Sequence, residues 1–158
     1  MEPISRSENA AAVDGLDAVR MRRAELRESL SFLEFTLAAP ASGREVVWGE
    51  AVHDALVTLV GDFGAHVDVT ECAGGLHETI LSRDLRLTNA VDALTAEHAE
   101  MSAMLAALVD DSRPPVVGAD VDTLRERATC LLGLIVRHRQ TGADLVYEAF
   151  HTDVGGAD

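Results

Sequence analysis

The sequence is poor in aromatic, cysteine and basic residues, and each shortage excludes a class of protein. Aromatic residues make up 4% of the 158 residues, too few for the base-stacking platforms of many nucleic-acid-binding folds. Two cysteines, Cys72 and Cys130, cannot form a disulfide framework, and no CxxC pair indicates a zinc knuckle. The 13 basic residues stand against 27 acidic ones, for a formal charge of −14. Such a chain repels phosphate backbones and anionic lipids, so we expect neither nucleic acid nor a membrane as partner.

Long apolar runs are absent as well. The longest such run, residues 130–136, falls far short of the about 20 residues that a bilayer-spanning helix needs. The polar segment 1–12 has no apolar stretch of the kind that a secretory signal requires. With both cysteines expected to be reduced, the sequence predicts a cytoplasmic protein. It leaves the oligomeric state open.

The residues that are abundant favour helices. Ala, Leu, Glu and Arg are frequent, and hydrophobic residues make up 47% of the chain. Breakers at residues 40–43, 74–75 and 112–118 divide the chain into four long segments. We expect one domain over residues 13–154, preceded by a disordered leader at 1–12 and followed by a flexible tail at 155–158.

In each of the four segments, mostly apolar residues recur at alternating spacings of three and four residues. The repeats cover residues 16–37, 52–70, 87–108 and 124–149. This spacing is typical of helices that bury one stripe, here called a seam. Long amphipathic helices joined by short loops pack against each other in opposite directions. The sequence therefore predicts an all-α fold, an up-down-up-down antiparallel four-helix bundle.

Three of the four seams carry a histidine: His66, His98 and His138. The first segment has Arg23 at the matching position. A lone histidine on a seam is usually a core residue whose ring nitrogens bond to a carbonyl or a carboxylate. Three in one bundle are harder to satisfy, because each buried imidazole has two nitrogens. A metal ion would satisfy one nitrogen of each ring at once.

Carboxylates at similar heights complete the candidate site. Glu71, Glu97, Asp144 and Glu148 are positioned to supply oxygen ligands or to bond to the ligating histidines. Imidazole with carboxylate and without thiolate is typical of iron, manganese or zinc sites. The predicted metal ligands are His66, Glu71, His98, His138, Glu148 and Asp144.

The order and spacing of these motifs resemble the hemerythrin-like (HHE cation-binding) family. The resemblance spans roughly residues 14–154 and is carried by HVDVTECAGGLHETIL (66–81), LTAEHAEM (94–101) and HRQTGADLVYEAFHTDVGG (138–156). It implies a four-helix bundle with a non-haem iron centre of one or two ions. It also implies a small diatomic ligand, dioxygen or nitric oxide, or peroxide at an open coordination position. The three seam histidines match the family's ligand histidines directly.

Three positions depart from the family pattern. Arg23 or Arg22 stands where the first helix of the family has a histidine. The residues four after His66 and His138 are Thr70 and Gly142, where the family has acids. A guanidinium beside a metal ion is repelled unless carboxylates stand between them. The alternative is a metal-free bundle that acts as a binding or interaction module, with Arg23 and the seam histidines in a buried polar network. A third candidate, a di-metal oxidase, has no substrate that the sequence identifies.

The remaining polar candidates are expected outside this site. His77 follows the Gly74–Gly75 break, so we expect a surface or loop residue, with an extra ligand or a gate as the alternative. His53 lies 13 residues before His66, which turns it toward solvent on a helix. Cys72 and Cys130 are expected as small apolar fillers of the core.

Overall fold

The computed structural model describes residues 6–151, and all regular structure in that range is helical. The elements are α1 (Arg6–Ala38), α2 (Glu45–Glu71), α3 (Leu76–Arg83), the 3-10 helix η1 (Leu85–Leu87), α4 (Thr88–Asp111) and α5 (Gly118–His151). The prediction of an all-α protein is confirmed.

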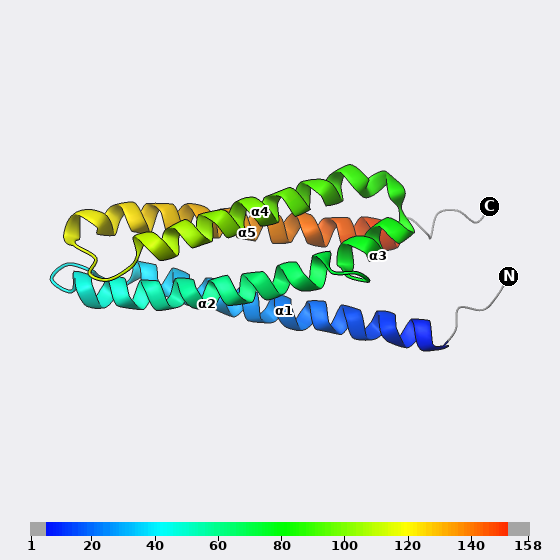
Figure 1. The fold of residues 1–158 in the computed structure, drawn as a ribbon, viewed down its shortest axis with the longest axis horizontal. Helices are drawn as coiled ribbons and strands as arrows, with labels where there is room; N and C mark the ends of the chain where they lie inside the picture. The colour runs from blue at the N-terminus through cyan, green and yellow to red at the C-terminus, as the bar shows by residue number, and fades with distance from the viewer. Residues whose placement is uncertain (1–5, 152–158) are drawn as a thin grey trace.

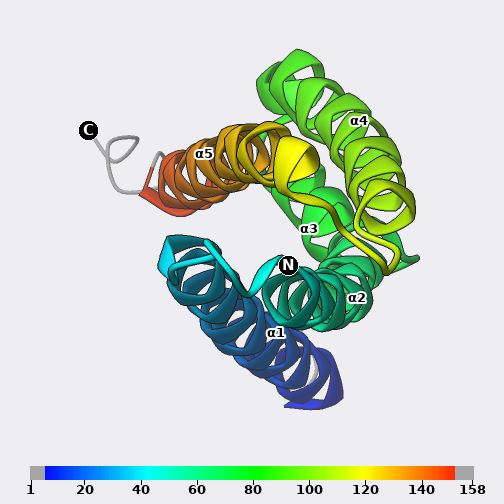
Figure 2. The ribbon, with the colours of Figure 1, turned by 90° about the vertical axis from the view of Figure 1, so that its left-hand side faces the viewer.

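The long helices α1, α2, α4 and α5 lie side by side along the molecule, and Figure 1 shows the chain running back and forth along its length. α1 packs mainly against α2, and α4 packs against α2 and α5. Viewed along the axis, α3 lies between these helices (Figure 2) and contacts all four of them. The short helix α3 therefore fills one end of the space that the long helices enclose.

Two boundaries differ from the sequence-based expectation. Residues 6–12, predicted as part of a disordered leader, belong to α1. Residues 1–5 and the predicted tail at 155–158 lie outside the described residues. The segment between the glycine pair and the start of the third repeat forms α3 and η1, which the repeat pattern did not predict.

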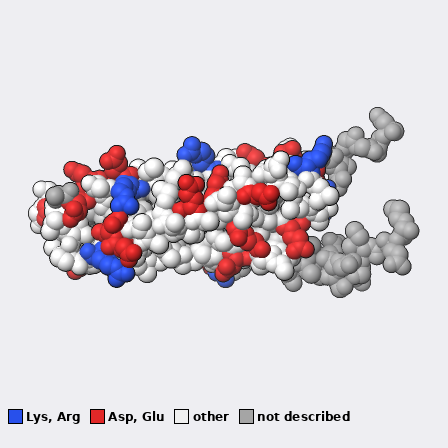
Figure 3. Space-filling model, turned by 45° about the horizontal axis from the view of Figure 1, so that its top comes forward, with Lys and Arg blue, Asp and Glu red and all other residues white. Residues whose placement is uncertain are grey.

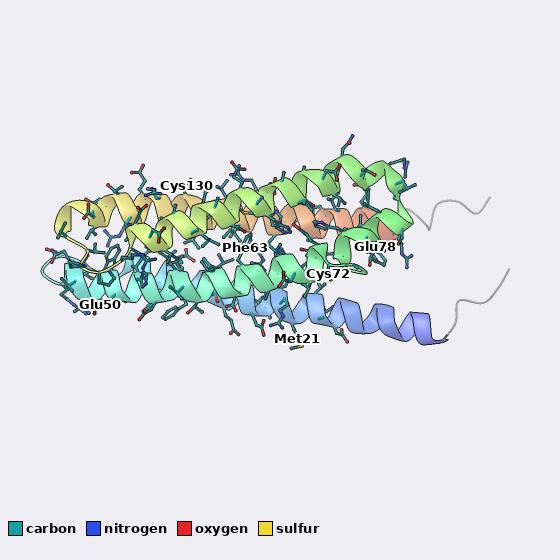
Figure 4. All side chains as sticks on the ribbon, viewed as in Figure 1. Met21, Glu50, Phe63, Cys72, Glu78 and Cys130 are labelled. Atoms are coloured by element: carbon teal, nitrogen blue, oxygen red, sulfur yellow. The ribbon has the colours of Figure 1, made fainter. Side chains whose placement is uncertain are left out.

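The predicted seams form the core. Their fully buried large residues include Leu26, Leu33, Leu56, Leu59, Phe63, Leu105, Leu131 and Ile135. Figure 4 shows Phe63 on α2, facing the interior. Burying a side chain of this size contributes about 1.5–3 kcal/mol. The 3.6-residue period alone therefore identified most of the residues that hold the helices together.

The core is divided into two apolar clusters. One contains Phe63, Met101 and Ile135, and the other contains Leu94 and Leu145. On α1, α4 and α5 the polar residue of the seam stands between the two clusters, as His98 does between Leu94 and Met101. A polar layer thus crosses the bundle and separates one apolar region from the other.

The charged side chains and both cysteines lie on the surface of the protein. Figure 3 shows acidic side chains spread along the length of one face, with basic side chains scattered among them. Within residues 6–151, no helix combines the length and the hydropathy needed to cross a membrane. Cys72 and Cys130 are both exposed and unpaired, so the expectation that they fill the core is wrong. Cys72 directly follows the end of α2, and Cys130 lies on α5 (Figure 4).

The break between α2 and α3 depends on two glycines for different reasons. Gly74 has a φ of 75°, in the left-handed region that favours glycine. Gly75 has an ordinary φ, but its surroundings leave no room for a side chain. An added Cβ would lie 2.7 Å from the carbonyl oxygen of Cys72 and 2.8 Å from that of Thr70. This tight turn lets α3 begin at Leu76 and pack into the end of the bundle.

We expect Gly75→Ala to lower the free energy of unfolding by roughly 1–3 kcal/mol, since backbone oxygens must move away from the new methyl group. Gly64→Ala in α2 is the control, because an added Cβ there meets nothing within 4 Å. That change should stabilise the helix by up to about 1 kcal/mol. Thermal unfolding of both variants measures the difference, and equal Tm changes would contradict this account of the turn.

Candidate metal centre

Three histidines from three helices meet in the interior. His66 on α2, His98 on α4 and His138 on α5 are all buried. Nε2 of His98 lies 3.3 Å from Nε2 of His66 and 2.8 Å from Nε2 of His138. One possible ligand nitrogen of each ring lies within 4.8 Å of those of the other two. The prediction that these imidazoles converge on one interior point is confirmed.

The rings are held in place by the apolar layer beside them. The ring of Phe63 lies 6.0 Å from that of His66 and 5.9 Å from that of His98, measured between centroids. Its contact with His98 is edge-on, at an interplanar angle of 81°, an arrangement that aromatic rings favour. Phe63 occupies the seam position three residues before His66, which is why one turn of α2 supplies both the apolar wall and one imidazole.

Two carboxylates bond to the outer nitrogens of this cluster. Nδ1 of His98 lies 2.5 Å from Oε1 of Glu71, and Nδ1 of His138 lies 2.7 Å from Oε2 of Glu97. An ionised carboxylate only accepts hydrogen bonds, so each Nδ1 carries the hydrogen and donates it. In a neutral imidazole the other nitrogen, Nε2, then holds a lone pair. Glu71 and Glu97 therefore orient both Nε2 lone pairs toward the interior, as metal ligation requires.

The cluster needs one further positive charge. Burial, followed by the charges of His98 and His138, lowers the pKa of His66 to about 3, so this ring is neutral at pH 7. Burial also lowers the pKa of His98, with the hydrogen bond to Glu71 acting in the opposite direction. Nε2–H of a neutral His66 can donate to His98, but no hydrogen then remains for the contact between His98 and His138. A shared proton or a metal cation removes this conflict.

Two of the three nitrogen separations are compatible with binding to a single metal ion. Two imidazole nitrogens bound to one ion at about 2.0–2.1 Å lie about 2.8–3.4 Å apart, from neighbouring positions of an octahedron to those of a tetrahedron. The two Nε2 separations, 2.8 and 3.3 Å, are close to this range. Nδ1 of His66 is buried and has no hydrogen-bond partner among the described residues. A cation bound at Nε2 of His66 would still leave the Nδ1–H of this ring without an acceptor.

The acids predicted as oxygen ligands are not gathered around the Nε2 atoms. Glu71 approaches the cluster at Nδ1 of His98, and α2 remains a regular α-helix up to that residue. Asp144 is exposed and accepts a hydrogen bond of 3.0 Å from Gln140. Glu148 is also exposed. Asp144 follows His138 by six residues, which turns it roughly 240° around the helix and away from the interior.

His77, for which the sequence favoured a surface or loop position over a place in the site, lies beside the histidine cluster. It is buried on α3, its ring lies parallel to that of His98 with centroids 5.6 Å apart, and its Nδ1 is 3.1 Å from Oγ1 of Thr95. Burial lowers its pKa. The expectation of a surface or loop residue is wrong because α3 turns into the bundle. His53, expected to face solvent, is half-buried and 3.0 Å from Oγ of Ser112.

Two arginines share the cavity with the histidines. Arg23 on α1 and Arg139 on α5 line a cavity of about 20 Å³ together with His66, His98 and His138, which is room for about one water-sized group. Burial, and then the charge of Arg139, lowers the pKa of Arg23. Arg23 was predicted at this level of the bundle, whereas Arg139 was not. Its position directly after His138 is the only signal that the sequence offers.

Comparison of the chain with protein-family models, with curated protein sequences and with solved structures gave no match.

The metal-free protein should lose stability as the pH falls below the range in which an ordinary histidine is neutral. The pKa of His66 is about 3 in the folded protein, against 6.5 for an ordinary histidine such as that of the unfolded chain, so the unfolded chain binds more protons between these values. The stabilisation is present above pH 6.5 and is lost as the pH falls toward 3. Between about pH 7.5 and 5 the loss from this residue is about 2 kcal/mol.

Chemical denaturation of chelator-treated protein at several pH values measures this loss. The variant His66→Gln has no titrating group at that position, so its free energy of unfolding should fall less over the same interval. If the wild type and the variant show the same pH dependence, the buried neutral state assigned to His66 is wrong.

Proposed function

We propose that the protein is a hemerythrin-like, up-down-up-down antiparallel four-helix bundle that binds one non-haem metal ion through His66, His98 and His138. The observation that carries the proposal is the pair of hydrogen bonds from Nδ1 of His98 and His138 to Glu71 and Glu97. These bonds direct two lone pairs at one point, which a third buried imidazole also reaches. Without a cation at that point the lone pairs repel.

A single ion agrees better with this geometry than a pair. A di-iron centre needs carboxylate oxygens on the Nε2 side of the histidines to neutralise and bridge the ions. Among the described residues, Glu71 and Glu97 are engaged on the opposite side, at Nδ1. Asp144 and Glu148 are exposed. The cavity of about 20 Å³ is also small for two ions and their ligands.

The chemistry of the donor set limits the choice of metal and ligand. Imidazole nitrogen suits iron and zinc, and manganese accepts it with oxygen ligands. We propose iron because of the resemblance in the seam motifs. Three protein ligands leave coordination positions open, and bound iron would there accept dioxygen, nitric oxide or peroxide. Phe63 and Leu94, both buried beside the cluster, limit the access of water.

The cytoplasm is the proposed location. Exposed, unpaired thiols at Cys72 and Cys130 support it, because such thiols persist in reducing compartments.

Metal content after purification without a histidine tag tests the proposal. We expect about one ion per chain after growth with added iron, and the replacement His98→Ala should bring the content below about 0.2, since a buried ligand that joins the other two is lost. His151→Ala is the matched control because His151 is exposed at the end of α5. A wild-type content below about 0.2 would defeat the metal-binding proposal.

The outer carboxylates give a second test. Glu97→Gln should weaken metal affinity by about 10–100-fold, because the amide no longer fixes the tautomer and charge of His138. Glu100→Gln removes the same charge from an exposed position on the same helix and should leave the affinity unchanged. Competition with a coloured chelator measures both affinities. Equal losses in the two variants would mean that only overall charge matters.

The second candidate is the metal-free binding module, in which one proton replaces the metal in the histidine cluster. The specific observation in its favour is the position of Arg23 and Arg139 in the same cavity, since two guanidiniums oppose the binding of a cation. The metal content of the wild type decides between the two functions.

A further inference from the structure

A groove runs along the outside of the bundle between α1 and α5, which lie next to each other on one side of the bundle (Figure 2). Its volume is about 570 Å³, within the range of about 300–1,000 Å³ that is usual for small-molecule sites. Its lining comes from residues 27–38 of α1 and residues 125–139 of α5, and the latter stretch spans about 21 Å along the helix axis. We call it the α1–α5 groove. It shares one described residue, Arg139, with the lining of the histidine cavity.

The floor of the α1–α5 groove is apolar. Leu30 and Leu37 on α1 are buried, Leu132 on α5 is half-buried against the same core cluster, and Val136 is 56% exposed. These four side chains form what we call the apolar floor. Gly133 lies between the last two on α5, and an added Cβ there would meet nothing within 4 Å. The floor therefore offers apolar surface and free space to a ligand.

The charged residues of the groove reverse the charge balance of the chain. Arg27, Arg125 and Arg139 line the groove with a single acid, Glu34, although acids outnumber basic residues 27 to 13 overall. At one end of the groove Arg125 is already engaged. Its Nε and one terminal nitrogen donate hydrogen bonds of 2.8 and 3.1 Å to backbone carbonyls at and just beyond the end of α1.

The opposite end of the groove has two arginines without an anionic partner. Within residues 6–151, neither Arg27 nor Arg139 forms a hydrogen bond or an ion pair with another side chain, and Nε of Arg139 is buried without an acceptor. Burial, and then the charge of Arg27, lowers the pKa of Arg139. The two positive charges thus repel each other beside the apolar floor, and an anion placed between them would relieve this repulsion.

We propose that the α1–α5 groove binds a single-chain carboxylate amphiphile, a fatty acid of about 12–16 carbons, with its carboxylate at Arg27 and Arg139 and its chain along the apolar floor. One acyl chain spans half the hydrocarbon core of a bilayer, about 15 Å, so it fits within the length of the groove. Guanidiniums donate strong, often bidentate hydrogen bonds to carboxylates. The engaged Arg125 leaves the other end of the groove to the tail. The inference does not depend on the metal site.

Calorimetric titration of the full-length protein with dodecanoate, kept below its micelle concentration, tests the inference. We expect about one dodecanoate per chain. Octanoate should bind about tenfold more weakly or worse, because four methylenes fewer are buried. Dodecanol, which has the same chain without the charge, should also bind at least tenfold more weakly than dodecanoate.

Charge variants locate the carboxylate. Arg27→Gln and Arg139→Gln should each raise the dodecanoate Kd about tenfold, since each loses a charged donor. Arg137→Gln is the matched control, because Arg137 is exposed on α5 and does not line the groove. Arg27 does not line the histidine cavity, so Arg27→Gln reports on the groove alone.

A variant that fills the groove locates the chain. Gly133→Leu places a side chain in the free space beside the apolar floor and should raise the dodecanoate Kd tenfold or more. Gly61→Leu is the control, because Gly61 is an exposed glycine of α2, outside the groove, where an added Cβ also meets nothing within 4 Å. Leucine favours the helix over glycine at both positions. Thermal unfolding of each variant checks that the fold is retained.

The outcomes decide for or against the inference. Weaker binding in Arg27→Gln, Arg139→Gln and Gly133→Leu, with both controls like the wild type, supports it. Absence of dodecanoate binding to the wild type overturns it, as does an unchanged Kd in Gly133→Leu or in both groove arginine variants. Sedimentation velocity covers the other occupant: a wild-type dimer that Gly133→Leu converts to a monomer would assign the groove to a second copy of the chain and overturn the inference.

Discussion

The hydrogen bonds from two imidazoles to Glu71 and Glu97 determine what the interior of this bundle can do. Each bond fixes the hydrogen on Nδ1 and turns the Nε2 lone pair inward. The second of these lone pairs then meets the first at 2.8 Å, an arrangement that is unfavourable unless a positive charge lies between them. The carboxylates stand at the edge of the core, where water still solvates them in part. The acids thus control a buried site without being buried themselves.

Stability and function compete at this layer. Apolar residues on both sides contribute the burial that holds the helices together, whereas the imidazoles and guanidiniums between them lose solvation without complete pairing. A group that satisfies them would stabilise the folded state in proportion to its binding. The same logic explains why the polar layer is confined to one level of the bundle: a second such layer would remove more apolar contact than the remaining core can offset.

Helical period made the main part of the site predictable. His66, His98 and His138 share the spacing of their apolar neighbours, so their inward direction follows from the sequence alone. The hydrogen bond of Glu71 to His98 did not follow from the helical period. It depends on the end of α2 at Glu71 and on the direction that this side chain takes there. His77 was missed because α3 is only eight residues long, too short for a repeat pattern to show. Arg139 was missed because its position beside His138 does not lie on the seam, and only the packing of α1 near α5 directs it to the same cavity.

The division of the core into two apolar clusters has a consequence for how the helices align. Sliding one helix by a single turn, about 5.4 Å, would preserve most leucine-to-leucine contacts, since the seams repeat at similar intervals. It would also set an imidazole against a leucine and leave a carboxylate opposite no ring nitrogen. Alignments that bury nearly equal apolar area therefore differ in energy because only one of them pairs the groups of the polar layer. The polar layer in this way selects one axial register of the helices.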